Sequence, residues 1–549
     1  MKPALVKKSS DLLVKARIDV ARSDYSGASN YYRKMLDLAE KNRNANNLLA
    51  SYVGLGTCYE ALGDNAEAVK YYELAVKLVE ELRSSVERGQ RERFFSVKVN
   101  GFYRTDPYKG LARVLFKINR IPEALKIAEF TKARVFSEAI SNQGAGKNFG
   151  VPSDVIKVDQ EINEQISALK VSRQRAYQKE NQALAISLEP KIKELEKKLT
   201  SHIAMLREKY PQFAATRYPQ PMDLSQQSLG PNEWAIIYDV SHSGILIFLV
   251  KGKEVVRAVF RPIARDELVK LVRKFRDPME VKSGKDLHDK LASFDFAAGK
   301  ALSDLLLVEI IKDLPKESSV IIVPDDCLGL LPFEMLVLNE GGRVLFDGQT
   351  VHVSGAEFLG DRNQVYYNQS LTSLSLARAS TGEKKSVNRL LVIADPVFDV
   401  KDQRAQITGD TTIAGVQKDY FESLMVTIEE TSKGSFKFNR LSETSLLAND
   451  LGDLYAGKTD KLTGLAASKS NLIGPSAKDI GNYRWIVFAT HGWFSKDTPG
   501  LSEPFLALTM IPPGTDGFLK MSDVASLKIT ADLVALTACQ TGLGKELSG

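Results

Sequence analysis

Two residues near the C-terminus of the chain have types and positions that suit nucleophilic chemistry. His491 follows the apolar stretch 485–489, and Cys539 follows the apolar stretch 533–536. In an open α/β sheet, reactive groups gather beyond the carboxyl ends of the strands, because loops and helix N-termini converge there. If the two stretches are neighbouring parallel strands, the imidazole and the thiol lie at one edge of the sheet.

A cysteine and a histidine at one sheet edge have a defined chemistry. A free thiol has a pKa near 8.5 and is mostly protonated at neutral pH. A nearby imidazole can take the proton from the thiol and later give it to a leaving amine. Gly492 has no side chain, so its amide, together with that of Cys539, could form an oxyanion hole. One such donor typically contributes about 3 kcal/mol of transition-state stabilisation.

A structural interpretation exists for each of these residues. A lone cysteine at the end of an apolar strand is usually a small buried hydrophobe, and a lone histidine there is usually satisfied locally. The matching strand contexts favour the interpretation of His491 and Cys539 as a pair. Cys58 and Cys327 keep the structural interpretation. The remaining histidines have no matching partner and are expected at the surface: His202, His242, His288 and His352.

Composition argues against several other classes of function. The 549-residue chain has three scattered cysteines and five histidines without an H-x-x-x-H pair, so we predict no metal. We predict no other cofactor either, because the stretch 145–147 lacks the glycine spacing of a phosphate-binding loop. Basic and acidic residues are interspersed, which argues against direct nucleic-acid binding. No apolar run has the length of a membrane span or a signal peptide, which predicts a cytoplasmic protein without membrane contact.

The first 140 residues are predicted to form helical repeats. The spacing of large, small and aromatic residues is that of a tetratricopeptide helix pair: Tyr52, Leu55, Gly56, Tyr59, Ala68, Tyr72 and Ala75. The small residues allow two antiparallel helices to approach closely, and the aromatic rings fill the gaps between neighbouring pairs. Similar patterns upstream, at 28–35, and downstream, at 108–124, predict three helix pairs; a plain helical bundle is the alternative.

Residues 141–232 are predicted to form a helical hairpin that follows the repeats. Two apolar seams of the kind found in coiled coils run through highly charged sequence, the first at 155–169 and the second at 192–206. Pro190 suits the first turn of a new helix, so an antiparallel hairpin is favoured over one long rod. We interpret it as a structural spacer.

From residue 233 the pattern changes to α/β. Three stretches with turns between them read as antiparallel strands: 234–240, 244–250 and 254–260. Apolar runs then alternate with amphipathic helices: 319–323, 389–394, 485–489 and 533–536. Such runs are typical of a mostly parallel sheet that helices cover on both faces. We therefore expect one α/β domain at 233–549, with an N-terminal part at 233–385 and a catalytic part at 386–549.

Two motifs resemble the signatures of a known family. Phe-Ala-Thr-His-Gly at 488–492 and Thr-Ala-Cys-Gln-Thr-Gly-Leu-Gly at 537–544 are similar to those of CHAT domains, caspase-like domains found behind tetratricopeptide repeats. Further stretches match as well: 323–325, 331–334, 441–450 and 531–533. The resemblance implies the clan of caspases, separases and gingipains, in which the histidine also precedes the cysteine. It implies that His491 is the general base, Cys539 the nucleophile and Gly492 an oxyanion donor, and that the N-terminal part is a pseudo-caspase.

The resemblance also implies a function. We expect a cysteine endopeptidase that cleaves a protein or peptide substrate, with the repeat groove binding a regulatory protein partner. The chain ends at Gly549, where the family continues, so we expect a catalytic part truncated at its C-terminus. Thr537 stands where relatives that cut after Arg or Lys can carry an acid, so a basic P1 residue is not implied. The alternative is a non-catalytic scaffold with a degenerate or truncated peptidase domain.

Overall fold

The computed structural model describes most of the chain, with gaps. The described residues are 3–84, 94–95, 97–141, 151–178, 181–218, 220, 224–226, 229–279, 289–347, 350–379, 389–399, 401–407, 438–474, 477–493, 504–511, 515–527 and 529–537. They fall into two compact units, one within residues 1–380 and the other within 381–545. No described helix combines the length and the apolarity needed to cross a bilayer.

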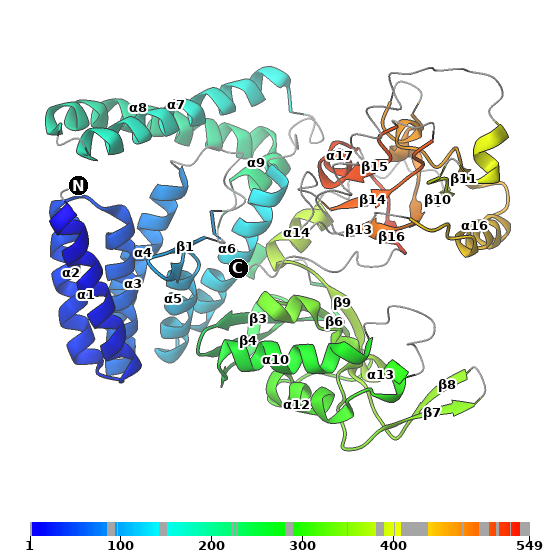
Figure 1. Ribbon diagram of the computed structural model, residues 1–549, viewed down its shortest axis with the longest axis horizontal. Helices are drawn as coiled ribbons and strands as arrows, with labels where there is room; N and C mark the ends of the chain where they lie inside the picture. Colours follow the sequence, from blue (N-terminus) through cyan, green and yellow to red (C-terminus); the bar gives the residue numbers. More distant parts are fainter. Residues whose placement is uncertain are drawn as a thin grey trace. The chain divides into compact units, whose positions relative to one another are not determined.

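The first unit begins with three helix pairs, which confirms the predicted helical repeats (Figure 1). The pairs are α1 (Pro3–Ala21) with α2 (Tyr25–Lys41), α3 (Ala45–Leu62) with α4 (Asn65–Ser84), and α5 (Asp106–Lys117) with α6 (Ile121–Ser141). A short hairpin of β1 (Lys98–Val99) and β2 (Phe102–Tyr103) lies between α4 and α5. This hairpin lengthens the connection between the second and third helix pairs.

Small residues set the close packing of the repeat helices. A Cβ atom placed on Gly56 would lie 2.7 Å from the ring of Tyr72, and one placed on Gly54 would lie 2.4 Å from the ring of Tyr32. Contacts this short do not occur between real side chains, so only glycine fits at these two positions. Gly63 ends α3 with a φ of +81°, the left-handed conformation that favours glycine after a helix.

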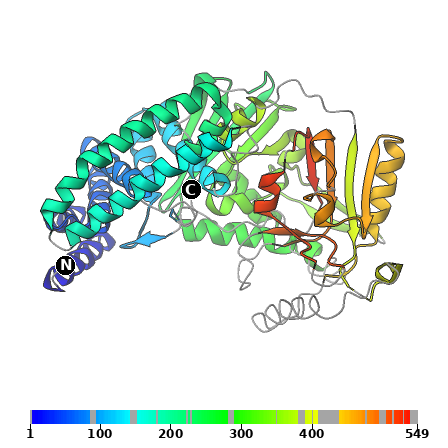
Figure 2. The same cartoon turned by 90° about the horizontal axis from the view of Figure 1, so that it is seen from above.

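A long helical hairpin follows the repeats and consists of α7 (Ser153–Gln178) and α8 (Gln182–Lys209), which lie side by side in both views (Figures 1 and 2). Ion pairs join Lys170 to Glu196 at 2.8 Å and Arg173 to Glu189 at 2.9 Å. The later residue of α7 pairs with the earlier residue of α8, so the two helices are antiparallel, as predicted.

The predicted position of Pro190 within this hairpin is wrong. Pro190 lies inside α8 rather than in its first turn. The helix begins earlier because the side chain of Asn181 caps it, accepting a hydrogen bond from the amide of Leu184 at 3.0 Å. Proline has no N–H, so one i→i−4 hydrogen bond is missing within α8.

The first α/β sheet has the strand order β5-β4-β3-β6-β9. Its strands are β3 (Glu233–Ser241), β4 (Gly244–Lys251), β5 (Glu254–Pro262), β6 (Ser319–Val323) and β9 (Gln364–Tyr367). The first three are antiparallel neighbours, as predicted, whereas β6 and β9 extend the sheet in parallel. The short apolar run 319–323 is thus confirmed as a strand.

Helices cover both faces of this sheet, and they come from two different parts of the sequence. Ile236 and Tyr238 pack with residues of α10 (Arg265–Arg276) and α12 (Phe296–Leu306). Ala235 and Ile237 point to the opposite face and share one hydrophobic core with the repeat helices. The period of two along β3 therefore separates the two cores.

The second unit contains a four-stranded parallel sheet with the order β11-β10-β12-β16. Its strands are β10 (Leu390–Pro396), β11 (Thr459–Gly464), β12 (Trp485–Ala489) and β16 (Leu533–Leu536). Helix α16 (Glu443–Leu454) packs on β10 through Ala448, beside Leu390 and Val392 (Figure 1). The parallel sheet predicted for the second half is confirmed.

The described part of the second unit has two further features. A three-stranded antiparallel sheet consists of β13 (Gly492–Trp493), β14 (Phe505–Ala507) and β15 (Phe518–Lys520), followed by α17 (Met521–Ser526). Strand β16 is less buried than its apolar sequence predicts. Leu533 is 57% exposed and Leu536 is 48% exposed, because β16 is the outermost strand that the structure describes in this sheet.

Candidate active site

The candidate site is built on two neighbouring strands of the second sheet. β12 and β16 pair in parallel, with Trp485 opposite Leu533 and Phe488 opposite Leu536. The amide of Thr537 continues this pairing and donates a hydrogen bond to the carbonyl oxygen of Phe488 at 2.9 Å. The two apolar stretches that precede the predicted catalytic pair are therefore adjacent and parallel, as expected.

The register of this pairing matches the separation of His491 and Cys539 along the sequence. Paired residues on β12 and β16 differ by 48 in number, since Phe488 lies opposite Leu536. His491 and Cys539 differ by the same 48, each standing three residues beyond this last pair. Cys539 itself lies outside the described residues, so its distance from the imidazole stays a prediction.

The backbone around the predicted histidine is held on both sides. Gly492 is buried and starts β13, where it pairs with Leu506 of β14. The amide of Ala507 donates to the carbonyl oxygen of His491 at 2.8 Å, and the buried hydroxyl of Thr490 donates to the carbonyl oxygen of Ala507 at 2.5 Å. The antiparallel sheet thus fixes the chain where it leaves β12.

The imidazole of His491 has a defined hydrogen bond. Its Nε2 lies 2.7 Å from the carbonyl oxygen of Asn439. A carbonyl oxygen only accepts, so Nε2 carries the hydrogen and donates it. In the neutral ring, Nδ1 is then the unprotonated nitrogen and the atom that can accept a proton. The ring lies beside Phe398 and Phe438, with centroids at 5.6 and 5.4 Å.

An ion pair between a buried aspartate and a partly exposed arginine, which the sequence reasoning missed, lies next to this hydrogen bond. Asp395 is the penultimate residue of β10 and is 2% exposed, and both its carboxylate oxygens accept from Arg440, Nε at 3.0 Å and Nη2 at 2.8 Å. Arg404 donates from Nη1 to the carbonyl oxygen of Asp395 at 2.9 Å. Asp395 lies at the carboxyl end of a buried strand, and the rule of strand ends that selected His491 would have identified it.

A second acid belongs to the same cluster. Asp402 accepts from Arg404 through both carboxylate oxygens, at 3.0 and 2.6 Å. The hydrogen bonds from Arg404 lower the pKa of Asp402 to about 2. Among the described residues, no three His, Cys, Asp or Glu side chains are grouped to hold a metal ion.

The residues expected to be structural mostly take that role. Cys58 and Cys327 are buried, and burial raises the pKa of the Cys58 thiol to about 12, so this thiol is unreactive. His242 and His352 are exposed, as expected. His288 lies outside the described residues.

The expectation of a surface position is wrong for His202. Its side chain is 8% exposed, and Nε2 lies 3.8 Å from Oδ1 of Asp159 on the facing helix α7. The cause is the face of α8 on which His202 stands, which packs against α7.

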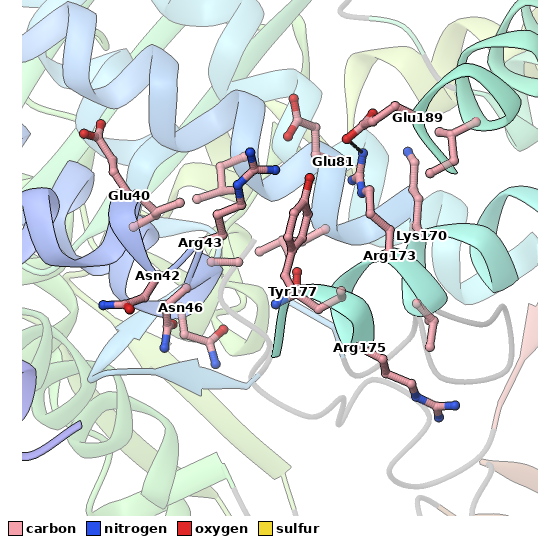
Figure 3. A pocket seen from close by; sticks show the side chains of 18 of the residues that line it. Glu40, Asn42, Arg43, Asn46, Glu81, Lys170, Arg173, Arg175, Tyr177 and Glu189 are labelled. Carbon is pink, nitrogen blue, oxygen red and sulfur yellow. Dashed lines mark hydrogen bonds and ion pairs between the residues drawn. The ribbon is translucent and has the colours of Figure 1, made fainter. Parts of the chain in front are cut away.

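A cavity in the first unit lies between the repeats and the hairpin (Figure 3). It has a volume of about 930 Å³, and helices α2, α3, α4, α7 and α8 contribute to its walls. Arg43 lies over the ring of Tyr177 at 4.0 Å, and Arg173 pairs with Glu189 across one wall. The lining is strongly charged in both signs, with Glu40, Glu81 and Lys193 among its residues.

Comparison with known families agrees with this architecture. The model of the CHAT domain matches residues 297–549, and a tetratricopeptide repeat model matches residues 12–81. The CHAT match begins inside α12, although β3, β4 and β5 belong to the same sheet as β6. No curated protein matches the chain. The chain thus joins tetratricopeptide repeats to a CHAT domain, a domain of the caspase-like peptidase type.

Proposed function

We propose that this chain is a cysteine endopeptidase that uses Cys539 as nucleophile and His491 as general base. One observation carries the proposal: β12 and β16 are parallel neighbours in a register that matches the separation of the two residues. The hydrogen bond from Nε2 to Asn439 supports it, because this bond leaves Nδ1 of the neutral imidazole as the proton acceptor.

The proposed reaction proceeds through an acyl-enzyme. The thiol of Cys539 gives its proton to Nδ1 of His491, and the sulfur attacks the carbonyl carbon of the scissile peptide bond. The amide of Gly492 is proposed to donate to the resulting oxyanion. The C–N bond then breaks as the imidazolium returns the proton to the leaving amine. Water hydrolyses the thioester, with the same imidazole as base, and restores the thiol.

We propose that the repeats regulate this activity by binding a protein partner. The cavity between the repeats and the hairpin supports this part, because a lining of charged side chains and aromatic rings suits a polar peptide segment. The cytosol keeps thiols reduced, which favours a free catalytic cysteine, and we therefore also propose a cytoplasmic location. Direct contact with membranes or nucleic acid is not part of the proposal.

A second candidate function is that of a non-catalytic scaffold. The observation that favours it is the same cavity, which would serve a partner whether or not the CHAT domain cleaves anything. In a scaffold, the strand-end cysteine and histidine would be remnants of a peptidase site.

A labelling experiment separates the two candidates. The chain is incubated with electrophilic peptide probes of varied P1 residue, with and without cell lysate, and modification of Cys539 is measured by mass spectrometry. An endopeptidase is labelled at Cys539 in preference to Cys58 and Cys327, and His491→Ala abolishes this preference. If Cys539 reacts no faster than a free thiol in any condition, the peptidase proposal fails and the scaffold remains.

A further inference from the structure

We infer that the ion pair between Asp395 and Arg440 positions the imidazole of His491, by holding the backbone carbonyl that accepts its hydrogen bond. This inference rests on the proposed peptidase function for its consequence, since a fixed imidazole matters for proton transfer. The two side chains contact no reacting atom, so both are positioning residues rather than catalytic ones.

Asp395 is a rigid anchor for the pair. It is 2% exposed and has a φ of +46°, a left-handed conformation that non-glycine residues seldom adopt. Its amide donates to the hydroxyl of Thr444 at 3.0 Å, and its carbonyl oxygen accepts from Arg404 at 2.9 Å. Backbone and side chain of Asp395 are therefore both held in place.

Arg440 links Asp395 to the neighbouring residue, Asn439. Its guanidinium binds the carboxylate of Asp395 through two parallel hydrogen bonds, the most directional form of such a pair. Asn439 directly precedes Arg440, so the ion pair limits where the carbonyl of Asn439 can lie. A second tie follows, because the hydroxyl of Thr444 donates to the carbonyl oxygen of Leu441 at 2.7 Å. The segment is thus held at Arg440 and again at Leu441.

The carbonyl of Asn439 then orients the imidazole. It accepts from Nε2 of His491 at 2.7 Å, while Phe398 and Phe438 lie against the ring. β10 and β12 are paired neighbours, with Ala394 opposite Ala489, so Asp395 and His491 both lie at the carboxyl edge of the sheet. The chain of contacts runs without a gap from the end of β10 to the imidazole.

A purely structural ion pair would stabilise the fold without affecting the tautomer of His491. A structural role and a positioning role therefore predict different results when the ion pair is removed. If Arg440 positions the carbonyl, its removal frees Nε2 from its acceptor, and the neutral ring populates both tautomers. The charged residues joined to this segment are Asp395, Asp402, Arg404 and Arg440, and the Arg440→Met variant removes one positive charge from them.

The test reads the tautomer of His491 directly in the whole chain. Ring-¹⁵N-labelled histidine gives only five imidazole systems, and His491→Gln assigns the one of interest. We expect the Nε2–H tautomer in the wild type and a mixture of tautomers in Arg440→Met and Asp395→Asn. Arg440→Lys, which keeps the charge without the two parallel bonds, is expected to fall between them. Arg484→Met breaks the surface pair with Asp532 in the same unit and serves as the matched control.

The functional readout is the alkylation rate of Cys539 by iodoacetamide at neutral pH. We expect a decrease of tenfold or more in Arg440→Met, with no change in Arg484→Met. A Nδ1–H tautomer in the wild type overturns the inference without any variant, as does a wild-type tautomer in a folded Arg440→Met or Arg440→Lys. If Cys539 is unreactive in the wild type, the peptidase proposal fails, but the tautomer measurement still decides whether the ion pair positions His491.

Discussion

Each of the two larger sheets of this chain has an aspartate at the carboxyl end of a buried strand, but the two aspartates have different surroundings. Asp325 follows β6 in the first unit, and Asp395 is the penultimate residue of β10 in the second. Lysines of the repeat helices reach Asp325, and Nζ of Lys109 lies 2.6 Å from its Oδ2. Arginines from nearby loops reach Asp395, and Arg440 among them remains 49% exposed.

The carboxyl edge of the first sheet is closed. Lys109 also donates to the carbonyl oxygen of Val240 at 2.6 Å, and Lys132 donates to that of Tyr238 at 2.6 Å. Burial alone would raise the pKa of Asp325, but the charges of both lysines outweigh it and lower the pKa to about 2. The carboxyl ends of β3 and β6 are thus covered by lysine side chains of the repeat helices.

The edge of the second sheet is organised differently. Its aspartate fastens a loop segment, and that segment accepts the hydrogen bond of a partly exposed imidazole. An acid at a strand end is therefore not a sign of chemistry by itself. What distinguishes the second edge is that its ion pair leaves a titratable group accessible, whereas the ion pairs of the first edge are covered.

The largest expected effect is at the second edge. His491→Ala should lower the rate at which a peptide probe labels Cys539 by about 10²–10⁴, because a positioned base typically contributes this much. His352→Ala, at an exposed position of the first unit, is the matched control and should leave the rate unchanged. If the probe labels Cys539 equally fast in His491→Ala and in the wild type, His491 does not act as a base and the two sheet edges no longer differ in function.

The next effect is on stability at the first edge. Lys109→Met leaves the carboxylate of Asp325 buried with much weaker compensation, and breaking a buried pair in this way costs about 3–5 kcal/mol. We expect faster hydrogen exchange in β3 and α5, with Cys539 labelling retained. The double variant Lys109→Met/Asp325→Asn should recover part of the loss. If Lys109→Met exchanges like the wild type, the lysine does not hold the repeats to this sheet.

A third prediction concerns the pH response of the first unit. Glu129 on α6 is buried and accepts from the amide of Leu371 at 2.7 Å, and burial raises its pKa to about 7. A raised folded pKa favours the protonated acid, so the folded state is stabilised below about pH 4.5 and loses this stability as the pH rises through 7. The total change is on the order of 3–4 kcal/mol, from a pKa raised to about 7.

Glu129→Gln provides the measurement. Thermal unfolding of the first unit is followed from pH 5 to pH 8 in both proteins. The unfolding temperature of the wild type should fall from pH 5 to pH 8. The unfolding temperature of Glu129→Gln should change less over this range and should be higher than that of the wild type at pH 8. Parallel curves would mean that Glu129 stays ionised in the folded chain.

Sequence patterns predicted the elements that depend on local periodicity. The runs at 319–323 and 485–489 became strands, because short apolar stretches between turns fit a sheet with helices on both faces. The glycines of α3 are an equally local signal. These signals lie within a few residues of the structure that they specify.

The remaining features depend on contacts between distant positions. Asp395 and Arg440 are 45 residues apart, and no period in the sequence relates them. His202 was placed wrongly because its burial depends on which face of α8 meets Asp159, on another helix. Pro190 was placed wrongly because a capping asparagine outweighed a residue that usually starts a helix. Spacing alone specifies none of these pairings.

The smallest predicted effect comes from a variant at the amino edge of the second sheet, opposite the candidate site. Arg484 and Asp532 pair at 2.6 Å at the amino ends of β12 and β16, with side chains 42% and 29% exposed. Solvent screens such a pair, so Arg484→Met should cost only about 0.2–1 kcal/mol and leave Cys539 labelling unchanged. A loss of labelling similar to that of Arg440→Met would show that any disturbance of this sheet reaches the site, and the carboxyl edge would lose its special role. An unchanged rate with slightly lower stability confines the effect to the edge where Asp395, Arg440 and His491 are connected.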